Sequence, residues 1–277
     1  MRRSERIVRL TRELLNHPGQ PLSLTDLADH YSVAKSSLSE DLAIIRMVME
    51  QDGEGLLRTQ LGAAGGVVFE PGITRTTAER FVVSLMERFH QGARMLPGGY
   101  LYIADVMADP VVVRTAGRMF GEMFREKRPD VVLTVETNGI PLAVLAAQEL
   151  HVPYVVARRD HTWLEGPSVS TNYESGSDRR LHTMSLARRS IKQGARVVII
   201  DDFMKAGGTI RGMTSLMEEF AADVVGIGVL LSTSEPQDKR VGAYTSLLFL
   251  DSVNATDGAI HMRQGNYFSR VEEERHG

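Results

Sequence analysis

The segment of the chain with the most chemistry combines two adjacent acids with a run of small residues. A carboxylate accepts hydrogen bonds from ribose hydroxyls, small residues let backbone N–H groups approach a phosphate, and a threonine hydroxyl donates one more bond. Adjacent carboxylates repel each other unless a ligand or a donor uses them. We therefore expect the segment to bind a ribose that carries a 5-phosphate. The expected contacts come from Asp201, Asp202, Phe203, Met204, Lys205, Ala206, Gly207, Gly208 and Thr209.

The elements on either side must hold this loop at one edge of a sheet. The apolar residues 197–200 predict a buried strand, and residues 208–220 predict a helix. Ligands of open α/β sheets bind outside the carboxyl ends of the strands, and a helix N-terminus adds N–H donors and a favourable dipole for an anion. The loop has neither the Gly-Lys-Ser/Thr ending of a P-loop nor the Gly-x-Gly-x-x-Gly dinucleotide fingerprint.

Two further strand ends carry residues suited to the same ligand. They are Thr137, Asn138 and Gly139 after the apolar run 131–135, and Arg158 and Arg159 after the apolar run 153–157. The arginine pair can complement phosphate charge, and its alternative is a solvated face. No arrangement of His or Glu indicates a general base, so we expect no catalytic residues and interpret His161 and His182 as loop histidines.

Alternating helices and strands over residues 75–277 predict an α/β domain with a central parallel sheet. The expected helices are 77–91, 109–125, 140–150, 185–193 and 208–220, and the expected strands are 131–135, 153–157, 197–200, 224–231 and 247–250. The polar residues 159–183 are expected to form a functional loop, because long structureless stretches inside compact domains are more often functional than decorative. Residues 263–277 are polar and support no prediction.

Residues 1–74 have a different organisation. Their periodicity predicts a helix at 4–16, a short helix capped by Thr25, and a third helix capped by Ser36 or Ser37. Two short strands, 56–59 and 67–69, are expected around a glycine-rich tip at 62–66. Helix, helix, turn, helix and hairpin, in this order, are typical of a winged helix-turn-helix, which binds DNA.

Composition narrows the class of protein further. The chain has 277 residues, of which 43% are hydrophobic and 24% charged, so disordered and low-complexity classes are excluded. No stretch predicts a membrane span or a signal peptide. The absence of cysteine excludes disulfides and cysteine-ligated zinc, no metal site is expected, and we expect a cytoplasmic protein.

The net charge of −3 argues at first against a nucleic-acid partner, yet the charge is unevenly distributed. Residues 1–12 contain five arginines against one glutamate, a local charge of +4 that can neutralise phosphates. The candidate DNA contacts are Arg2, Arg3, Arg6, Lys35, Ser36, Ser37, Arg58, Gly65 and Gly66. The alternatives are a solvated basic helix for the arginines and helix capping alone for the serines.

Two resemblances sharpen this interpretation. Residues 197–209 resemble the phosphoribosyl diphosphate (PRPP) motif of type I phosphoribosyltransferases, although Lys205 and Ala206 stand where the enzymes usually carry small or hydroxyl residues. The whole chain resembles the purine operon repressor family of Gram-positive bacteria, in which Lys-Ala is the family's own form. The segments that carry this resemblance are 34–42, 62–67, 96–100, 172–177, 184–187 and 200–209.

The family resemblance implies a homodimer whose residues 1–74 bind double-stranded operator DNA of purine biosynthesis and transport genes. PRPP bound to residues 75–277 would release the repressor, with residues 135–141 as the pyrophosphate loop and residues 161–182 as the flexible loop over the site. It also implies that catalysis is lost and that guanosine tetraphosphate binds the same pocket. Tyr100, Tyr102 or Phe203 would stack on its base. No cofactor is required, and Mg²⁺ is expected only together with PRPP.

Two other functions stay open at this point. The first is an active purine or pyrimidine phosphoribosyltransferase with an N-terminal dimerisation domain, which Lys205, Ala206 and the lack of a recognisable base-binding segment disfavour. The second is a transcriptional activator, because the same pair of domains can act either way according to the position of the operator.

Overall fold

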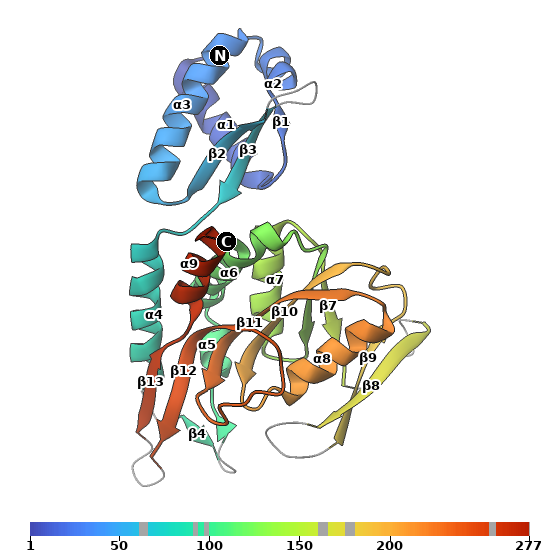
Figure 1. Ribbon diagram of the computed structural model, residues 1–277. Helices are drawn as coiled ribbons and strands as arrows, with labels where there is room; N and C mark the ends of the chain where they lie inside the picture. Colours follow the sequence, from blue (N-terminus) through green and yellow to red (C-terminus); the bar gives the residue numbers. More distant parts are fainter. Residues whose placement is uncertain are drawn as a thin grey trace. The chain divides into compact units, whose positions relative to one another are not determined.

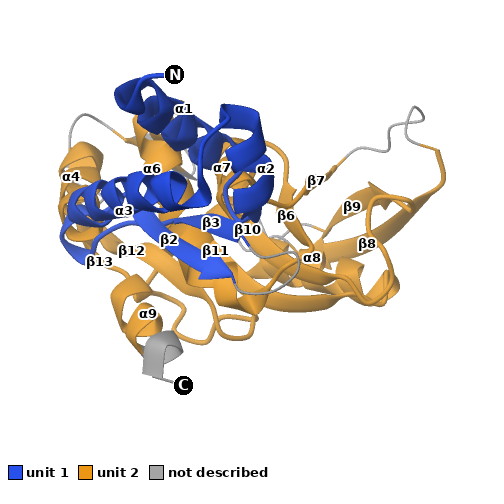
Figure 2. Ribbon diagram, turned by 90° about the horizontal axis from the view of Figure 1, so that it is seen from above, with its two compact units in different colours: residues 1–77 blue, residues 78–277 orange. Residues whose placement is uncertain are grey.

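The computed structural model describes residues 1–60, 66–90, 94–96, 100–159, 166–174, 181–254 and 259–276, with the backbone alone at Met95, Tyr100 and residues 273–276. The chain divides into two compact units, Met1–Thr77 and Ala78–Gly277, drawn in blue and orange in Figure 2. Apolar side chains form a separate core in each unit, so each unit folds around its own interior.

The described residues of unit 1 form three helices and a three-stranded antiparallel sheet in the order β1-β3-β2 (Figure 1). The elements are α1 (Arg3–Asn16), β1 (Leu22–Ser23), α2 (Leu24–Tyr31), α3 (Lys35–Asp52), β2 (Gly55–Gln60) and β3 (Gly66–Pro71). Leu10 and Leu14 of α1 pack with Leu38 and Leu42 of α3, as their helical spacing predicts. The predicted winged helix-turn-helix is confirmed.

Both predicted helix caps in unit 1 are wrong. The Ser23 hydroxyl, rather than Thr25, accepts the N–H of Asp26 at 3.3 Å. Ser23 ends β1 and pairs with β3, so the sheet holds it in the extended conformation that an N-cap requires. Helix α3 begins at Lys35 with Ala34 as its N-cap, which leaves Ser36 and Ser37 inside the first turn.

Unit 2 is built on a six-stranded sheet in the order β13-β12-β11-β10-β6-β7, parallel except for the edge strand β13. The strands are β6 (Val131–Val135), β7 (Tyr154–Ala157), β10 (Arg196–Met204), β11 (Asp223–Thr233), β12 (Thr245–Val253) and β13 (Ile260–Gln264). The helices are α4 (Arg75–His90), α5 (Ala104–Met107), α6 (Pro110–Phe124), the short 3-10 helix η1 (Arg125–Lys127), α7 (Ile140–Leu150), α8 (Gly208–Glu219) and α9 (Tyr267–His276). Two small hairpins accompany the sheet, β4 (Met95–Leu96) with β5 (Tyr100–Leu101) and β8 (Ser168–Glu174) with β9 (Leu181–Ala187). The predicted α/β class is confirmed.

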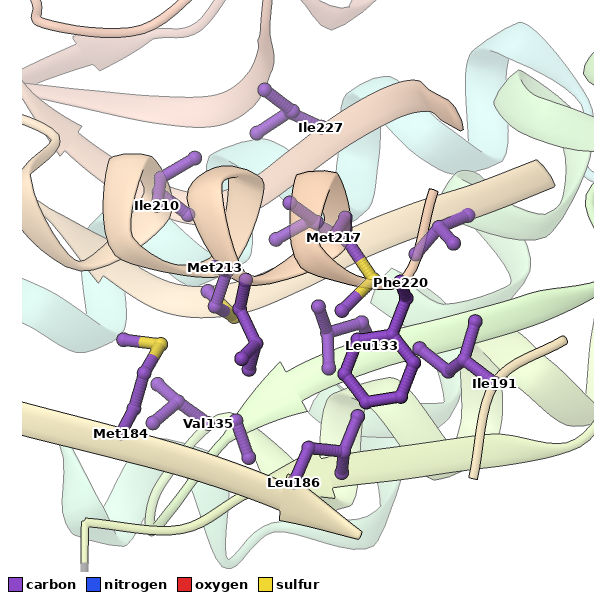
Figure 3. Close-up of a cluster of buried hydrophobic side chains, with 14 of the residues drawn as sticks. Leu133, Val135, Met184, Leu186, Ile191, Ile210, Met213, Met217, Phe220 and Ile227 are labelled. Carbon is purple, nitrogen blue, oxygen red and sulfur yellow. The ribbon is translucent and has the colours of Figure 1, made fainter. Parts of the chain in front are cut away.

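Different elements cover the two faces of this sheet. On one face, α8 and β9 enclose apolar side chains with β6 and β11, as Figure 3 shows for Leu133, Met184, Met213 and Ile227. On the other face α6 lies against β11, because Gly228 leaves space for the ring of Phe120, to which an added Cβ would approach within 2.8 Å. Covered on both faces, the parallel strands are the apolar runs visible in the sequence.

The segment between β7 and β10 differs from the prediction. Residues 168–174 and 181–187 pair as the antiparallel hairpin β8–β9 instead of forming one loop, and the helix expected at 185–193 is wrong. Met184 and Leu186 are buried on the sheet, and Ser185 pairs with the backbone of Arg158. Tertiary pairing therefore overrides the helix propensity of this stretch.

The C-terminal stretch, for which the sequence supports no prediction, is structured. Strand β13 adds an antiparallel edge to β12, and α9 follows it. Tyr267 and Phe268 of α9 are buried, so two aromatic residues in a polar tail were the available signal. No helix among the described residues is long and apolar enough to cross a membrane.

Candidate ligand site and nucleic-acid interface

The two acids lie at the carboxyl end of β10, which extends past the predicted strand to Met204. The Asp201 side chain is buried, and its Oδ1 accepts the N–H of Asp202 at 3.0 Å. Burial raises the pKa of the Asp201 carboxyl well above its ordinary value, the charge of Asp202 raises it further, and the charge of Arg159 opposes this. Burial also raises the pKa of Asp202. The two carboxyl groups are thus poorly solvated, and their charged forms gain from a ligand that donates hydrogen bonds.

The segment after β6 lies directly against these acids. A Cβ added to Gly139 would come within 2.8 Å of Asp201 Oδ1 and 2.7 Å of Thr134 Oγ1, so only glycine allows this approach. A hydrogen bond from the Asn138 side chain lowers the pKa of Asp202. The peptide bond between Glu136 and Thr137 is cis. The structure therefore brings together two segments that are more than sixty residues apart in the sequence.

The arginine pair after β7 belongs to the same edge of the sheet. Glu136 contacts both arginines. Its Oε1 accepts the backbone N–H of Arg159 at 2.5 Å, and its Oε2 lies 3.7 Å from the Arg158 guanidinium. The backbone of Arg158 pairs with Ser185 of β9, which attaches the β8–β9 hairpin to this strand end. Both arginine side chains are exposed, and the charge of Arg159 reaches Asp201.

Helix α8 opens directly from the loop that follows β10. Gly207 has a φ of +84° and Arg211 donates the first helical hydrogen bond to its carbonyl, so the N–H groups of Gly208, Thr209 and Ile210 precede the helical ladder. Amides in this position bind anions. Lys205 is exposed, and Phe203 is half-buried.

The aromatic predictions have different outcomes. Tyr102 is exposed, and its backbone bonds with Arg94: its N–H donates to the Arg94 carbonyl, and its carbonyl accepts the Arg94 guanidinium at 3.2 Å. The side chain of Tyr100 lies outside the described residues. His182 lies in β9 and not in a loop, so its interpretation as a loop histidine is wrong, and its ring centroid is 5.7 Å from that of Tyr173 on β8. His161 lies outside the described residues. The described residues hold no cluster of His, Cys, Asp and Glu fit for a metal ion.

Sequence reasoning missed the residues that hold the loop from behind. The carbonyl oxygen of Lys205 accepts the Nζ of Lys239 and lies 3.1 Å from the hydroxyl of Thr233, and the carbonyl of Ala206 accepts the N–H of Arg240. These contacts join a strand end and a loop about thirty residues downstream to backbone atoms. Side-chain-to-backbone contacts of this kind leave no motif in a sequence.

In unit 1 the structure corrects the role of the arginines. Arg6 is buried, and its Nε lies 2.5 Å from Oδ2 of the fully buried Asp41, so it joins α1 to α3 instead of facing solvent. Arg3 contributes a second contact to Asp41 at 2.9 Å but keeps half of its side chain exposed. Arg2 is exposed. Fewer arginines of α1 are therefore available to contact DNA phosphates than the sequence predicts.

The remaining candidates for DNA binding lie on α3 and on the hairpin. Lys35 and Ser36 are exposed in the first turn of α3, and Ser37 is partly exposed. Arg58 is exposed on β2 and pairs with Glu70 at 2.6 Å. Gly66 is buried against β1, where an added Cβ would come within 2.2 Å of a carbonyl oxygen, so its role is packing. Gly65 lies outside the described residues.

Comparisons with known proteins agree with this division of the chain. Residues 2–71 match the family "Bacterial purine repressor, N-terminal", and residues 105–256 match "Phosphoribosyl transferase domain". The chain is 48% identical to the purine biosynthesis transcriptional repressor of Bacillus subtilis over 96% of this chain and 93% of the relative. It is 41% identical to the purine biosynthesis transcriptional activator of Lactococcus lactis over 97% of this chain and 99% of the relative.

A solved structure supports the fold of unit 2. Adenine phosphoribosyltransferase from Rhodothermus marinus aligns with a TM-score of 0.53 and 25% identity, covering 61% of this chain and 99% of the enzyme. Unit 2 therefore has the type I phosphoribosyltransferase fold that the residues after β10 and β6 predicted.

Proposed function

The chain belongs to the bacterial purine repressor family, whose members regulate transcription of purine biosynthesis, and on this premise we propose that it represses purine biosynthesis and transport genes by binding operator DNA and is released by PRPP. The observation that carries the proposal is the approach of Gly139 to Asp201. This approach supports a single anion site formed by the loop after β6 and the loop after β10. The same chain carries a winged helix in unit 1.

PRPP fits this arrangement group by group. Asp201 and Asp202 would accept the ribose hydroxyls, and the amides that open α8 would bind the 5-phosphate. Residues 137–139 would bind the pyrophosphate with backbone amides, with Arg158 and Arg159 close enough to balance its charge. Mg²⁺ would arrive with PRPP. Guanosine tetraphosphate would use the same two anion loops and favour repression.

On the DNA side, the first turn of α3 and the β2–β3 hairpin support a standard winged-helix interface. Lys35, Ser36 and Ser37 would meet base edges and phosphates, and Arg2 and Arg58 would neutralise phosphates. The bacterial chromosome and the nucleotide pool share the cytoplasm, where we place this regulation. We propose a homodimer, as the resemblance to the purine operon repressor family implies.

Release requires that PRPP bind the DNA-free state more tightly than the DNA-bound state, because a ligand with equal affinity for both shifts nothing. We expect no transferase activity, since Lys205 and Ala206 stand where the enzymes usually carry small or hydroxyl residues. An active phosphoribosyltransferase is the second candidate, and the fold of unit 2 favours it. Nucleotide formation from PRPP and a radiolabelled purine or pyrimidine base would support the enzyme and contradict our proposal.

The test is fluorescence anisotropy with labelled promoter DNA of a purine gene, with and without PRPP. Wild-type protein should bind the DNA, and PRPP should weaken binding at least about tenfold. The double variant Asp201→Asn with Asp202→Asn should bind DNA as before and lose the response to PRPP. Binding that ignores PRPP, or a double variant that still responds, contradicts the proposal. Purine-gene transcripts should rise in a deletion strain, whereas a fall indicates an activator.

A further inference from the structure

Lys239 lies in the segment that connects β11 and β12, and its long side chain is turned inward. The residue is 9% exposed, and its Nζ lies 2.5 Å from the carbonyl oxygen of Lys205 and 3.0 Å from the hydroxyl of Thr233. We propose that Lys239 is a positioning residue that sets the direction of the phosphate-binding amides, without touching the ligand itself. This inference rests on the proposed function, because it assigns the 5-phosphate to the loop after β10.

The anchored carbonyls fix where the neighbouring amides point. The carbonyl of Lys205 accepts Lys239 Nζ, which also donates to the Thr233 hydroxyl oxygen. That hydroxyl lies 2.5 Å from the Glu235 carbonyl and 3.1 Å from the Lys205 carbonyl, and the carbonyl of Ala206 accepts the N–H of Arg240 at 3.1 Å. The C=O and N–H of one planar trans peptide point in opposite directions. The N–H groups of Ala206 and Gly207 must therefore point away from the segment that holds Lys239.

These two amides continue the row that opens α8. Arg211 donates the first helical hydrogen bond, to the Gly207 carbonyl, so the N–H groups of residues 208–210 precede the helical ladder. Successive backbone N–H groups can form a concave anion site, and we assign the 5-phosphate to this row of amides. A loop free to rotate its peptide planes would lose part of this convergence and would bind a phosphate less tightly.

Packing shows that the segment supports the loop directly. Gly207 has a φ of +84°, and a Cβ added to it would lie 2.8 Å from Cγ1 of Val241. Lys239, Arg240 and Val241 thus each contact the loop, two by hydrogen bonds and one by close packing. Burial lowers the pKa of Lys239, and the charge of Glu235 opposes that. A desolvated ammonium behind the loop also attracts a phosphate dianion more strongly than an exposed one would.

The experiment compares full-length wild type with Lys239→Met, Thr233→Val and the control Lys192→Met by isothermal titration calorimetry. Met keeps the length and apolar stem of lysine and removes the ammonium, and Lys192 is an exposed lysine four residues before β10. The probes are ribose 5-phosphate, pyrophosphate and PRPP. Ribose 5-phosphate and PRPP should bind Lys239→Met about tenfold more weakly, since a hydrogen bond to a charged group is lost from the loop's support.

The comparison between probes separates positioning from general damage. Pyrophosphate, assigned to residues 137–139, should bind all variants within about twofold of wild type. Thr233→Val should weaken ribose 5-phosphate less than Lys239→Met, and Lys192→Met should leave it unchanged. Unchanged ribose 5-phosphate binding in Lys239→Met, or equal losses for ribose 5-phosphate and pyrophosphate, overturns the inference.

The experiment also covers a Lys239→Met variant that does not fold and a wild-type protein that does not bind the ligands. If Lys239→Met does not fold, Thr233→Val alone decides, and unchanged ribose 5-phosphate binding in that variant overturns the inference. If folded wild-type protein binds neither PRPP nor ribose 5-phosphate, both the proposed function and the role of Lys239 are wrong. If wild type binds both ligands and the variants bind ribose 5-phosphate as tightly as wild type, only the role of Lys239 is wrong.

Discussion

At the scale of single residues, Asp201 has an energetic cost in the free protein. Its carboxyl is buried beside a second carboxyl, and burial together with that charge holds its pKa well above the ordinary value. Such a group destabilises the fold at neutral pH, because the unfolded chain ionises it freely in water whereas the folded state must either bind a proton or hold a buried charge. Ligand hydroxyls that donate to it would recover part of that cost, so stability and binding should respond in opposite directions when Asp201 is changed.

Asp201→Asn should therefore stabilise the free protein at pH 7.5 and weaken PRPP binding about tenfold or more. The raised pKa means that the folded state binds more protons than the unfolded state. The wild type accordingly loses stability as the pH rises from about 4 through the folded pKa, and the variant should lack this part of the dependence. Urea unfolding across pH measures it, with the exposed Asp238→Asn as control. A variant less stable than wild type at pH 7.5 contradicts the account.

In unit 1 we expect the opposite effect of an Asp→Asn change, because Asp41 is paired with Arg6 and its replacement should destabilise the fold. Removing one partner leaves the other charge buried, so Asp41→Asn should destabilise unit 1 by about 3 kcal/mol. Glu40→Gln, at a neighbouring exposed position, should cost less than about 0.5 kcal/mol. Hydrogen–deuterium exchange with mass spectrometry should show faster exchange in peptides of residues 1–77 and unchanged exchange in unit 2. Equal effects of the two variants would show that the pair is not a structural link.

At the scale of elements, the β8–β9 hairpin lies on the helix that opens from the phosphate loop. Tyr173 and Met184 belong to the core that α8 helps to form, and Arg240 pairs with Glu174 at the end of β8. The contact depends on Gly212 of α8, where an added Cβ would come within 2.8 Å of both Tyr173 and Met184. The β8–β9 hairpin and the loop after β10 are thus both held by α8 and by the segment that contains Arg240.

Gly212→Ala tests that support. The methyl group meets the Cβ and ring of Tyr173, so the hairpin must shift from α8, and limited proteolysis should cut β8 and β9 faster than in wild type. Gly242→Ala is the matched control, because an added Cβ there meets nothing within 4 Å. Equal cleavage rates in the two variants would mean that the hairpin does not depend on this contact.

The elements also show what the sequence could predict. Buried parallel strands such as β6 are continuous apolar runs, and the acids after β10 carry their chemistry in consecutive residues, so both were predictable. The hairpin β8–β9 was not, because its strands are polar on one side and take their stability from α8 and β7. Lys239 escaped prediction because it serves the site through a backbone carbonyl.

At the scale of the whole molecule, two units with separate cores carry the two sides of the proposed regulation. The chain's net charge of −3 does not indicate how either unit binds its anionic partner. The DNA side depends on a few exposed cations, so its affinity should fall as salt rises, with a slope set by the number of phosphates neutralised. Coupling then has to be a difference in the affinity of PRPP between the DNA-free and DNA-bound states.

That difference is directly measurable by titrating PRPP into the free protein and into its saturated complex with operator DNA at one salt concentration. Thermodynamic reciprocity requires the two PRPP dissociation constants to differ by the same factor by which PRPP weakens DNA binding. Our account predicts PRPP binding that is at least about tenfold weaker in the complex, a coupling of about 1.4 kcal/mol. Equal PRPP affinity for the free protein and the complex would contradict it.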